Sequence, residues 1–366
     1  MAEWVECKIG DLCDTISDTY KGNDENVILV NTSDVLEGKV LNHIQVPNKN
    51  LKGQFKKTFR KDDILFSEIR PANKRFAIID FEDTSNYIAS TKLMVLRHNE
   101  KILPEYLFAI LKSNYILTEL QHLAETRSGT FPQITFTSEL APMKVNLPDK
   151  KTQKQIVSIL SSIEKKIDAN ESINNNLEQQ AQAIFLKMFP DIFSASSSSS
   201  FQNLIEFSNG KKRPEAIGNI PVYGGNGILA YTNQSNAENS VIIGRVGAYC
   251  GNTFLCPEKC WISDNAIQAK SKNEDSQLFI YYLLRNASLP SRHIGTGQPL
   301  MTQAILNAVP VNEPSTQEIR SFINVCTPLH ETIFANEKQN ISLTILRDTL
   351  LPKLMSGELD VSDIDI

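Results

Sequence analysis

Two long stretches of the chain carry an apolar stripe with three- and four-residue spacing on an otherwise polar surface. The first stretch is residues 152–189, and the second, residues 315–355, repeats its pattern at one constant offset. Such a stripe predicts two long amphipathic helices that pack as a coiled coil. The stripe consists of Ile156, Ile159, Leu160, Ile163, Ile167, Asn170, Ile173, Leu177, Ile184 and Met188 in the first stretch, and of Phe322, Val325, Cys326, Leu329, Ile333, Asn336, Leu343, Leu350 and Leu354 in the second.

Two polar residues interrupt the stripes at equivalent positions. Asn170 corresponds to Asn336 at the offset of the two stripes, and each lies near the middle of its predicted helix. A polar pair in a helix seam costs some stability but specifies one register. We therefore predict that Asn170 and Asn336 set the register of the helix pair.

Signals for helix ends flank both stretches. The patterns Thr152-x-x-Gln155 and Ser315-x-x-Glu318 predict capping boxes at the two helix starts. Gly357 is a typical stop signal for the second helix.

Two globular blocks accompany the helices. The first block, residues 1–148, contains short β-branched runs separated by Gly, Asn, Asp and Pro, followed by one predicted helix, Pro104–Leu123. Strands that precede a helix without alternating with it predict an α+β domain with a strongly curved sheet. The predicted strands are residues 27–30, 63–66, 76–79 and 93–96.

The second block, residues 201–314, alternates strands with glycine-bearing turns and has its own predicted helix, Gln277–Asn286. Its pattern Leu278–Leu284 matches Tyr106–Lys112 of the first block, which indicates a tandem duplication of the globular parts. Close to the helices the match continues without a gap, at the same offset as the two stripes. There Gly129-Thr130, Ile134, Leu140, Val145 and Pro148 correspond to Gly295-Thr296, Leu300, Leu306, Val311 and Pro314.

The serine-rich segment 194–200 predicts a flexible linker. About eight linker residues reach roughly 28 Å, whereas a helix of about 35 residues spans roughly 50 Å. The second block must therefore start at the far end of the first helix. We expect antiparallel helices that separate two similar blocks related by an internal pseudo-two-fold axis. The predicted domains are the first block (1–148), the first helix (149–193), the linker (194–200), the second block (201–314), the second helix (315–357) and an acidic tail (358–366).

Composition indicates a soluble globular protein, since 41% of the 366 residues are hydrophobic and 22% are charged. No segment approaches the roughly 18 apolar residues of a membrane span, and Met1-Ala2-Glu3-Trp4 does not resemble a signal peptide, so we expect a cytoplasmic protein. A net charge of −5 argues against a protein that coats nucleic acid uniformly but permits a local basic face. The cysteines lack zinc-ligand spacing and are expected to be buried free thiols: Cys7, Cys13, Cys250, Cys256, Cys260 and Cys326.

Signatures of catalysis are missing from the sequence. It has no phosphate-binding loop, dinucleotide-binding glycine motif, serine-hydrolase elbow or HExxH motif, and no cofactor loop or target-amine turn of a methyltransferase. One nuclease-like pattern occurs, Pro148-Asp149 followed by Glu164-x-Lys166. Glu164 falls mid-helix, about two dozen ångströms from Asp149 at about 1.5 Å per residue, so this interpretation is not favoured. We expect neither a catalytic site nor a metal site.

Residues 52–75 contain eight basic side chains against three acidic ones, Asp62, Asp63 and Glu68. Two interpretations remain open. A run of charge is usually a solvated surface, but lysine and arginine on loops also hold the phosphates of a duplex. The basic residues are Lys52, Lys56, Lys57, Arg60, Lys61, Arg70, Lys74 and Arg75.

The segment Leu346–Leu359 resembles the C-terminal region of specificity (S) subunits of type I restriction-modification systems. The turns Ile220–Gly227 and Gly244–Gly247 resemble motifs in the target recognition domains of that family. The tandem layout matches too, so the resemblance covers essentially the whole chain. In the first block Glu68-Ile69-Arg70 stands where the second has Arg245-Val246, and the Tyr-Gly-x-Asn-Gly turn is missing. We expect a diverged recognition domain that reads a different half-site.

This resemblance implies a non-catalytic subunit that reads a bipartite target in double-stranded DNA, with the helix pair as a ruler for the unread spacer. It implies two methyltransferase subunits as partners in an adenine-N6 methyltransferase, and restriction subunits, with S-adenosylmethionine, ATP and Mg bound by those partners. In the major groove Arg would read guanine and Asn adenine, while Lys would hold phosphates. The expected DNA-binding residues are Lys56, Lys57, Arg60, Arg70, Lys74, Arg75 and Arg127 in the first block, and Lys211, Lys212, Arg213, Tyr223, Asn226, Arg245 and Arg292 in the second.

Alternatives stay open at this point. Tyr223 suits a hydrophobic core equally well, and Gly224, Gly225 and Gly227 could serve only to form a tight turn. A coiled-coil scaffold that joins two protein-binding domains without DNA contact would also fit the negative net charge. A self-contained nuclease rests on the Asp149 pattern alone.

Overall fold

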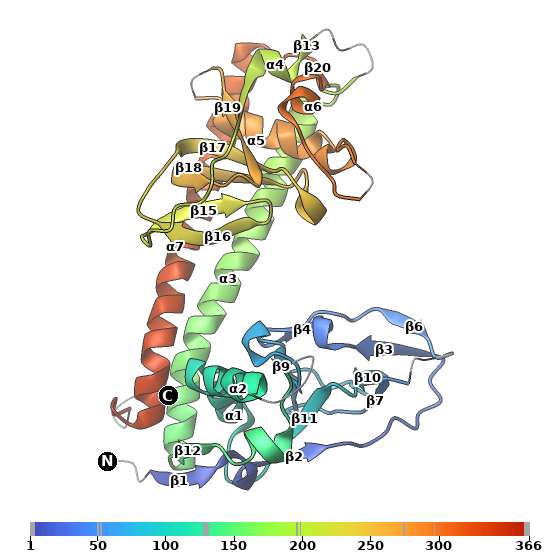
Figure 1. Ribbon diagram of the computed structural model, residues 1–366, viewed down its shortest axis with the longest axis vertical. Coiled ribbons are helices and arrows are strands. Elements are labelled where there is room, and N and C mark those ends of the chain that lie inside the picture. The colour runs from blue at the N-terminus through green and yellow to red at the C-terminus, as the bar shows by residue number, and fades with distance from the viewer. Residues whose placement is uncertain are drawn as a thin grey trace. The chain divides into compact units, whose positions relative to one another are not determined.

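The computed structural model describes residues 4–49, 51, 53–126, 132–194, 197, 199–273, 275–295 and 297–361 (Figure 1). The chain divides into two compact units. Unit 1 consists of Met1–Asp168 and Asn340–Ile366, and unit 2 consists of Ala169–Gln339. Each unit therefore combines one globular block with a part of both long helices.

The twelve strands described in unit 1 form two four-stranded sheets and two two-stranded pairs, where we expected one strongly curved sheet. They are β1 (Val5–Lys8), β2 (Cys13–Ile16), β3 (Asn26–Val30), β4 (Val35–Leu36), β5 (Lys39–Val40), β6 (Gln45–Pro47), β7 (Phe55–Lys57), β8 (Ile64–Ser67), β9 (Phe76–Ile78), β10 (Tyr87–Ser90), β11 (Leu93–His98) and β12 (Lys144–Leu147). The sheets have the orders β2-β11-β8-β9 and β6-β3-β10-β7, and side chains from both fill a common core. Helices cover the other face of the first sheet. Strands buried on both faces read as continuous hydrophobic runs, as β8 does.

Helices α1 (Pro104–Leu111) and α2 (Asn114–Thr126) replace the single predicted helix Pro104–Leu123. The helix breaks at Ser113, whose Oγ accepts a hydrogen bond from the N–H of Ile116 at 3.4 Å. Serine favours such caps because its hydroxyl replaces a missing carbonyl partner. The short turns of unit 1 are η1 (Ile9–Asp11), η2 (Thr32–Asp34), η3 (Pro71–Asn73) and the π-helical η4 (Phe136–Leu140).

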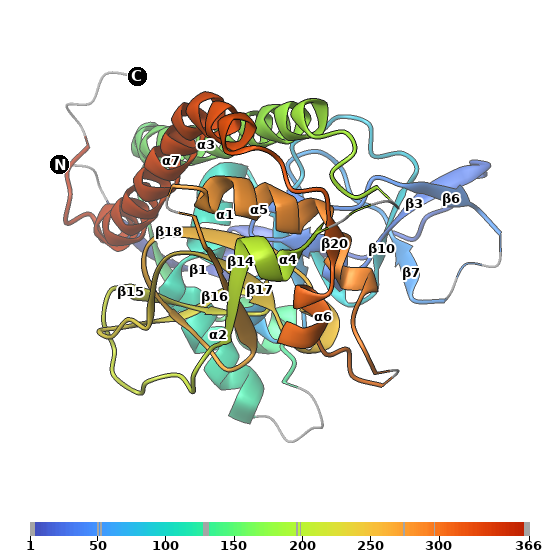
Figure 2. The same cartoon turned by 90° about the horizontal axis from the view of Figure 1, so that it is seen from above.

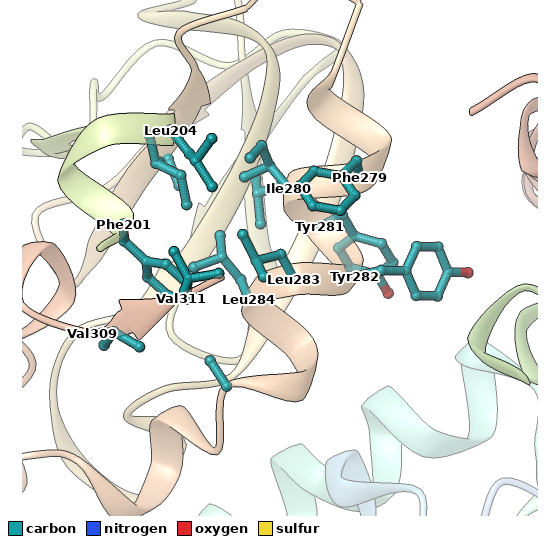
Figure 3. Packing of buried hydrophobic residues seen from close by; sticks show 14 of the residues in the cluster. Phe201, Leu204, Phe279, Ile280, Tyr281, Tyr282, Leu283, Leu284, Val309 and Val311 are labelled. Carbon is teal, nitrogen blue, oxygen red and sulfur yellow. The ribbon is translucent and has the colours of Figure 1, made fainter. Parts of the chain in front are cut away.

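Unit 2 is built on one six-stranded sheet of order β14-β19-β17-β18-β15-β16. Its strands are β13 (Ser199–Ser200), β14 (Ile205–Asn209), β15 (Ile220–Gly224), β16 (Gly227–Thr232), β17 (Ala237–Gly244), β18 (Thr253–Ile262), β19 (Ala266–Ser271) and β20 (Pro310–Val311), and its shorter helices and turns are α4 (Phe201–Leu204), η5 (Gly247–Tyr249), α5 (Gln277–Asn286), η6 (Leu289–Ser291) and α6 (Gln303–Asn307). Helix α5 has the predicted bounds and lies between the sheet and the long helices (Figure 2). Its side chains meet those of α4 and β20 in the core (Figure 3).

The two units repeat one sheet with matching strand ladders. The order β2-β11-β8-β9 of unit 1 corresponds to β14-β19-β17-β18 of unit 2, and α1 follows β11 as α5 follows β19. Equivalent facing pairs are Cys13–His98 and Ile205–Ser271, Ser67–Leu93 and Gly244–Ala266, and Phe66–Phe76 and Ile243–Thr253. The internal repeat predicted from the sequence is therefore present in the sheet topology.

The repeat contains one insertion close to the long helices. Thr135 and Thr302 precede equivalent helical turns with the same backbone angles, φ −123° and ψ 157°. Leu140 comes five residues after Thr135, whereas Leu306 comes four residues after Thr302. The π-helical geometry of η4 accommodates the extra residue. The predicted gapless match therefore pairs the correct residues after η4. Before η4 it pairs each residue with one that lies one position away from its true equivalent.

Helices α3 (Lys150–Met188) and α7 (Thr316–Ser356) agree with the predicted stretches 152–189 and 315–355 to within two residues, but α3 ends before the predicted helix domain 149–193 does. Among the residues that the structure describes, no helix is both long and apolar enough to span a membrane.

The two helix starts differ in their caps. At α7, the N–H of Glu318 donates to Ser315 Oγ at 3.3 Å and the N–H of Ser315 donates to Glu318 Oε2 at 2.8 Å, which is the predicted capping box. At α3, the predicted box at Thr152 is wrong. Asp149 is the cap, because its Oδ1 accepts from the N–H of Thr152 at 2.9 Å, and these bonds lower the pKa of the Asp149 carboxyl.

Polar side chains connect α3 and α7 within unit 2. Asn170 is fully buried, and its Nδ2 donates to Gln339 Oε1 at 2.8 Å. Asn336 Nδ2 donates to Asn174 Oδ1 at 2.8 Å. Rising residue numbers on α3 thus meet falling numbers on α7, so these parts of the helices run antiparallel. The two predicted register residues each bind an amide side chain of the facing helix.

Part of the predicted flexible linker is structured. Ser199–Ser200 form β13, which pairs antiparallel with β20, and Ser197 Oγ donates to the carbonyl oxygen of Ser194 at 2.7 Å. Residues 195, 196 and 198 of the linker lie outside the described residues.

Candidate nucleic-acid interface

Two glycine turns of unit 2 pack against each other. The first connects β15 to β16 and contains Gly225 and Asn226, and the second follows β17 at Gly244. A Cβ atom on Gly244 would lie 2.1 Å from the carbonyl oxygen of Tyr249 and 2.9 Å from that of Gly225. Only glycine permits this approach, so the two family-like motifs are parts of one surface.

The second turn, called turn 2 (residues 244–252), joins β17 to β18. The N–H of Gly244 closes it by donating to the carbonyl oxygen of Asn252 at 2.8 Å. The segment before α6 holds it from outside, since the N–H of Met301 donates to the carbonyl oxygen of Arg245 at 2.8 Å. Turn 2 therefore presents its side chains from a fixed backbone.

The equivalent turn of unit 1, called turn 1 (residues 67–75), joins β8 to β9. Its backbone shares several hydrogen bonds with turn 2, although the N–H of Lys74 donates to the carbonyl oxygen of Pro71 and that of Gly251 to the carbonyl oxygen of Gly244. The matched bonds, each from the N–H of the first residue to the carbonyl oxygen of the second, are Ser67–Arg75 (2.9 Å) with Gly244–Asn252 (2.8 Å), Asn73–Arg70 (2.9 Å) with Cys250–Gly247 (3.0 Å), and Glu68–Lys92 (3.0 Å) with Arg245–Asn265 (3.0 Å). Turn 1 also pairs at Ile69 with Gln133, as turn 2 pairs at Val246 with Leu300. One backbone framework thus carries two different sets of side chains.

An exposed basic segment, Lys211, Lys212 and Arg213, follows β14 in unit 2. The N–H of Lys211 donates to the carbonyl oxygen of Ile262 at 2.9 Å, which fixes the start of this segment. Its three cationic side chains have no intramolecular partner within the described part of the chain. Asn226 is exposed at the tip of the β15–β16 turn.

The other predicted contacts of unit 2 are partly used within the protein. Arg245 Nη1 donates to the carbonyl oxygen of Asp264 at 3.4 Å, while its buried Nε has no partner among the described residues. Arg292 Nε donates to the carbonyl oxygen of Ala287 at 2.7 Å, just after α5. Tyr223 packs into a small hydrophobic cluster, and burial raises the pKa of its hydroxyl. Its environment is that of a core residue.

Three predicted cations of unit 1 are exposed: Lys56 on β7, Arg60 after it, and Arg70 in turn 1. None of the three side chains has an intramolecular partner among the residues described. Positions that lie outside the described residues are Arg127, Lys52, Gly129-Thr130 and Thr296.

The remaining predicted cations of unit 1 have partners. Lys57 Nζ donates to a backbone carbonyl at 2.8 Å, and burial lowers the pKa of its ammonium group. Arg75 Nη1 donates to the carbonyl oxygen of Ser33 at 3.1 Å. Lys74 forms an ion pair with Glu37 at 3.1 Å, and both side chains are about half exposed. Lys57 and Arg75 thus hold loops in place, whereas an exposed pair such as that of Lys74 is weak and exchangeable.

Tyr249, which is 47% exposed on turn 2, was not among the predicted contacts. A Cβ on Gly225 would lie 3.7 Å from Tyr249 Cβ, so this side chain leaves the backbone beside the β15–β16 turn. Exposed aromatic rings are used to stack on bases. The available signal was its position two residues after Gly244-Arg245-Val246-Gly247. Leu229 and Tyr231 of β16, also about half exposed, add apolar surface in the same unit.

The nuclease-like residues have structural roles. Asp149 caps α3, and Glu164 forms an ion pair with Lys112 directly after α1. In the part of the chain that the structure describes, no three or more His, Cys, Asp or Glu side chains gather as metal ligands would. The six cysteines are free thiols, and all except the partly buried Cys7 are buried.

A family model, the type I restriction modification DNA specificity domain, matches residues 1–179 and 202–343. The chain belongs to this family. The resemblance predicted from the glycine turns, the tandem layout and the C-terminal segment is thereby confirmed.

Relatives with this domain include two specificity subunits. The chain is 46% identical over 194 residues to the type I restriction enzyme HindI specificity subunit of Haemophilus influenzae, a match that covers 52% of the chain and 42% of that protein. It is 24% identical over 309 residues to the type I restriction enzyme MjaIX specificity subunit of Methanocaldococcus jannaschii, covering 72% and 71%. The chain thus matches less than half the length of the HindI subunit.

Among solved structures, the S subunit of a type I restriction-modification system from M. genitalium has a similar fold. The TM-score is 0.54 at 18% sequence identity, over 97% of this chain and 96% of that one. The likeness supports the α+β architecture with two repeated domains.

Proposed function

We propose that this chain is the DNA specificity subunit of a type I restriction-modification complex. It reads a bipartite target in double-stranded DNA, one half-site with each unit, and leaves catalysis to its partners. Membership of the DNA specificity domain family supports the reading role. The structural roles of Asp149 and Glu164 remove the one nuclease-like pattern from consideration.

The observation that carries the proposal is the shared backbone of turn 1 and turn 2. A module that reads different sequences needs rigid backbone positions and exchangeable side chains. Hydrogen bonds of the same pattern hold both turns, but the side chains differ. Turn 1 presents Glu68, Arg70 and Lys74 where turn 2 presents Arg245, Gly247 and Gly251. Two half-sites of different sequence are the expected result.

The chemistry of unit 2 suits a major-groove contact. Arg245 makes only one long side-chain hydrogen bond, through Nη1 at 3.4 Å, and an arginine fork pairs with O6 and N7 of guanine, while the Asn226 amide pairs with adenine. Lys211, Lys212 and Arg213 would hold phosphates beside these turns. Because the net charge is −5, such local segments, and not the whole surface, would direct the DNA.

The proposed partners are two methyltransferase subunits and, in the endonuclease, restriction subunits. S-adenosylmethionine, ATP and Mg would be bound by these partners. The complex would act on DNA in the cytoplasm. Within it this chain supplies the two recognition surfaces and the helices on which the partners assemble.

Mapping of N6-methyladenine across the genome, with and without this chain, tests the proposal. We expect one bipartite motif to lose its methylation when the chain is removed. Retention of every motif would refute the proposal and favour a scaffold without DNA contact. Methylation of DNA by the purified chain alone would contradict the non-catalytic role.

An exchange of the turns tests the carrying observation. Residues 68–74 and 245–251 have the same length and share the matched backbone bonds given above, so replacing the first by the second should preserve the fold. We expect the methylated motif to change in one half only. A change in neither half would show that the turns do not read bases.

A further inference from the structure

Turn 1 and turn 2 enter the left-handed region of backbone conformation at the same two positions. In turn 2 these positions are Gly247, with φ +74°, and Gly251, with φ +89°. In turn 1 they are Arg70, with φ +46°, and Lys74, with φ +53°. Glycine adopts this conformation freely, but a side chain brings Cβ close to the following carbonyl oxygen. Turn 1 therefore carries backbone strain that turn 2 avoids.

The fold gives no reason for arginine and lysine at these positions. The Arg70 side chain has no intramolecular partner in the described part of the chain. Lys74 has only the half-exposed pair with Glu37, and such pairs contribute little. The bonds that close turn 1 are made by backbone atoms, which glycine would supply equally well.

The surroundings of turn 1 hold it in place, and its two cations are masked only by the exposed pair of Lys74 with Glu37. The N–H of Ala72 donates to Gln121 Oε1 at 3.1 Å, which ties the turn to α2. Arg75 is anchored through its bond to Ser33. The nearest acid in the turn, Glu68, lies 3.6 Å from Lys92 Nζ. Two cations thus project from one rigid turn beside a carboxylate that already has a partner.

Strained residues persist at functional sites because the side chain there has a use. We propose that Arg70 and Lys74 are DNA contacts of unit 1. Their cationic groups bind acceptor atoms of the duplex, and their side chains make the fold less stable than glycine would at the same positions. This inference rests on the proposed function. It assigns the difference between Arg70 and Gly247 to charge, since a Cβ on Gly247 would meet no atom within 4 Å, whereas one on Gly251 would lie 2.6 Å from the backbone nitrogen of Pro290. Unit 1 binds through the turn itself, and unit 2 through Lys211–Arg213 and Arg245.

Replacement of each residue by glycine tests this proposal, because the stability of the fold should rise while the affinity for DNA falls. For Arg70→Gly and Lys74→Gly in the full chain, relief of strain exceeds the entropy that glycine adds to the unfolded state, so the Tm should rise by about 1–3 °C. Assembled with its methyltransferase partner, each variant should bind a duplex containing the mapped motif about tenfold more weakly.

The form of the binding loss identifies the acceptor. If Arg70 reads guanine, Arg70→Gly should lower the affinity only for duplexes with the correct half-site. If Arg70 holds a phosphate, the affinity should fall equally for every sequence, and the slope of log affinity against log salt should become shallower by about one. Either result supports the inference. Unchanged affinity in a stabilised variant would overturn it.

Asp62→Gly is the matched control, because Asp62 has φ +69° in the same unit but lies outside turn 1. It should raise the Tm by less, because aspartate adopts this conformation more readily than arginine or lysine does, and it should not weaken the binding. A fall in affinity equal to that of Arg70→Gly would also overturn the inference. Gly247→Arg is the reciprocal variant, since a Cβ there meets no atom within 4 Å; it should lower the Tm and tighten binding. Failure of the unaltered complex to bind any duplex would instead refute the proposed function.

Discussion

Arg245→Met separates the two roles that an arginine in turn 2 could have. The guanidinium makes one long hydrogen bond, to Asp264 at 3.4 Å, and its buried Nε–H has no partner among the described residues. Methionine keeps the apolar stem of the side chain and removes the charge. The variant therefore tests whether Arg245 serves the fold or a ligand.

The magnitudes follow from these contacts. A bond at 3.4 Å lies beyond the usual range and contributes little, whereas a buried donor without a partner costs about 1–3 kcal/mol. The free energy of unfolding should therefore stay within about 1 kcal/mol of the original or rise. If the fork pairs with guanine, DNA binding should weaken by about 1–3 kcal/mol, which is roughly five- to 150-fold.

Arg292→Met is the matched control. Arg292 Nε donates to Ala287 at 2.7 Å, at the C-terminal end of α5. Loss of this charged bond and of its interaction with the helix dipole should lower the free energy of unfolding by about 1.5–3 kcal/mol. Urea denaturation of both variants, and titration of each assembled complex with target duplex, give the two readouts. If Arg245→Met cost more than about 2 kcal/mol of stability and left DNA affinity unchanged, Arg245 would be a structural residue and the assignment would fail.

Three further predictions concern the framework of the site. Phe185 of α3 is fully buried among four aromatic rings of unit 2, so Phe185→Ala should lower the free energy of unfolding in urea by about 3–5 kcal/mol. Its neighbour Leu186 is 52% exposed, so Leu186→Ala should change that free energy by no more than about 0.5 kcal/mol. Asp149→Ala removes the cap of α3 and should cost about 0.5–2 kcal/mol without changing DNA cleavage by the complete complex, contrary to a nuclease role. Burial lowers the pKa of His330 below its usual 6.5, so the folded state favours the neutral imidazole. The free energy of unfolding should therefore fall as the pH drops below about 6.5 and level off below the folded-state pKa. Denaturation at several pH values should show this step in the original protein and not in His330→Gln.

The long helices were predictable because their stripe repeats over many turns and depends on local spacing. The bounds of α3 and α7 differ from those of the striped stretches 152–189 and 315–355 by no more than two residues. The cap of α3 was misplaced because Asp149 and Thr152 both suit a helix start, and the sequence does not show which carboxylate or hydroxyl meets the free N–H groups. The break at Ser113 was missed for a similar reason, since the apolar pattern continues across it.

The equivalence of turn 1 and turn 2 was only half visible in the sequence. The offset from Ser67 to Gly244 is larger than the offset from Pro148 to Pro314. The loops between strands differ in length while the ladders are preserved, so a single offset aligns the helices and misaligns the sheets. Glu68-Ile69-Arg70 was nevertheless placed opposite Arg245-Val246, and the backbone bonds agree with that placement.

The sequence of the basic segment 52–75 does not show which of its cationic side chains bind groups within the protein. Lys57 and Arg75 look like their exposed neighbours in sequence, but their head groups bind backbone carbonyls of residues far along the chain. Such contacts depend on which strand passes beside the side chain. A charge pattern therefore indicates a surface but does not tell which of its members face a ligand.

Each unit begins and ends its globular block at a two-stranded ribbon. Strand β1 pairs with β12 directly before α3, and β13 pairs with β20 directly before α7. The first and last strands of each block therefore lie side by side, and the other strand pairs of the block are formed by the residues between these two strands. Recombination at the two ribbons could replace a whole block while leaving the helices and every ladder intact. Evolution could thus give such a chain a new half-site in one exchange, without a series of point mutations through unstable intermediates.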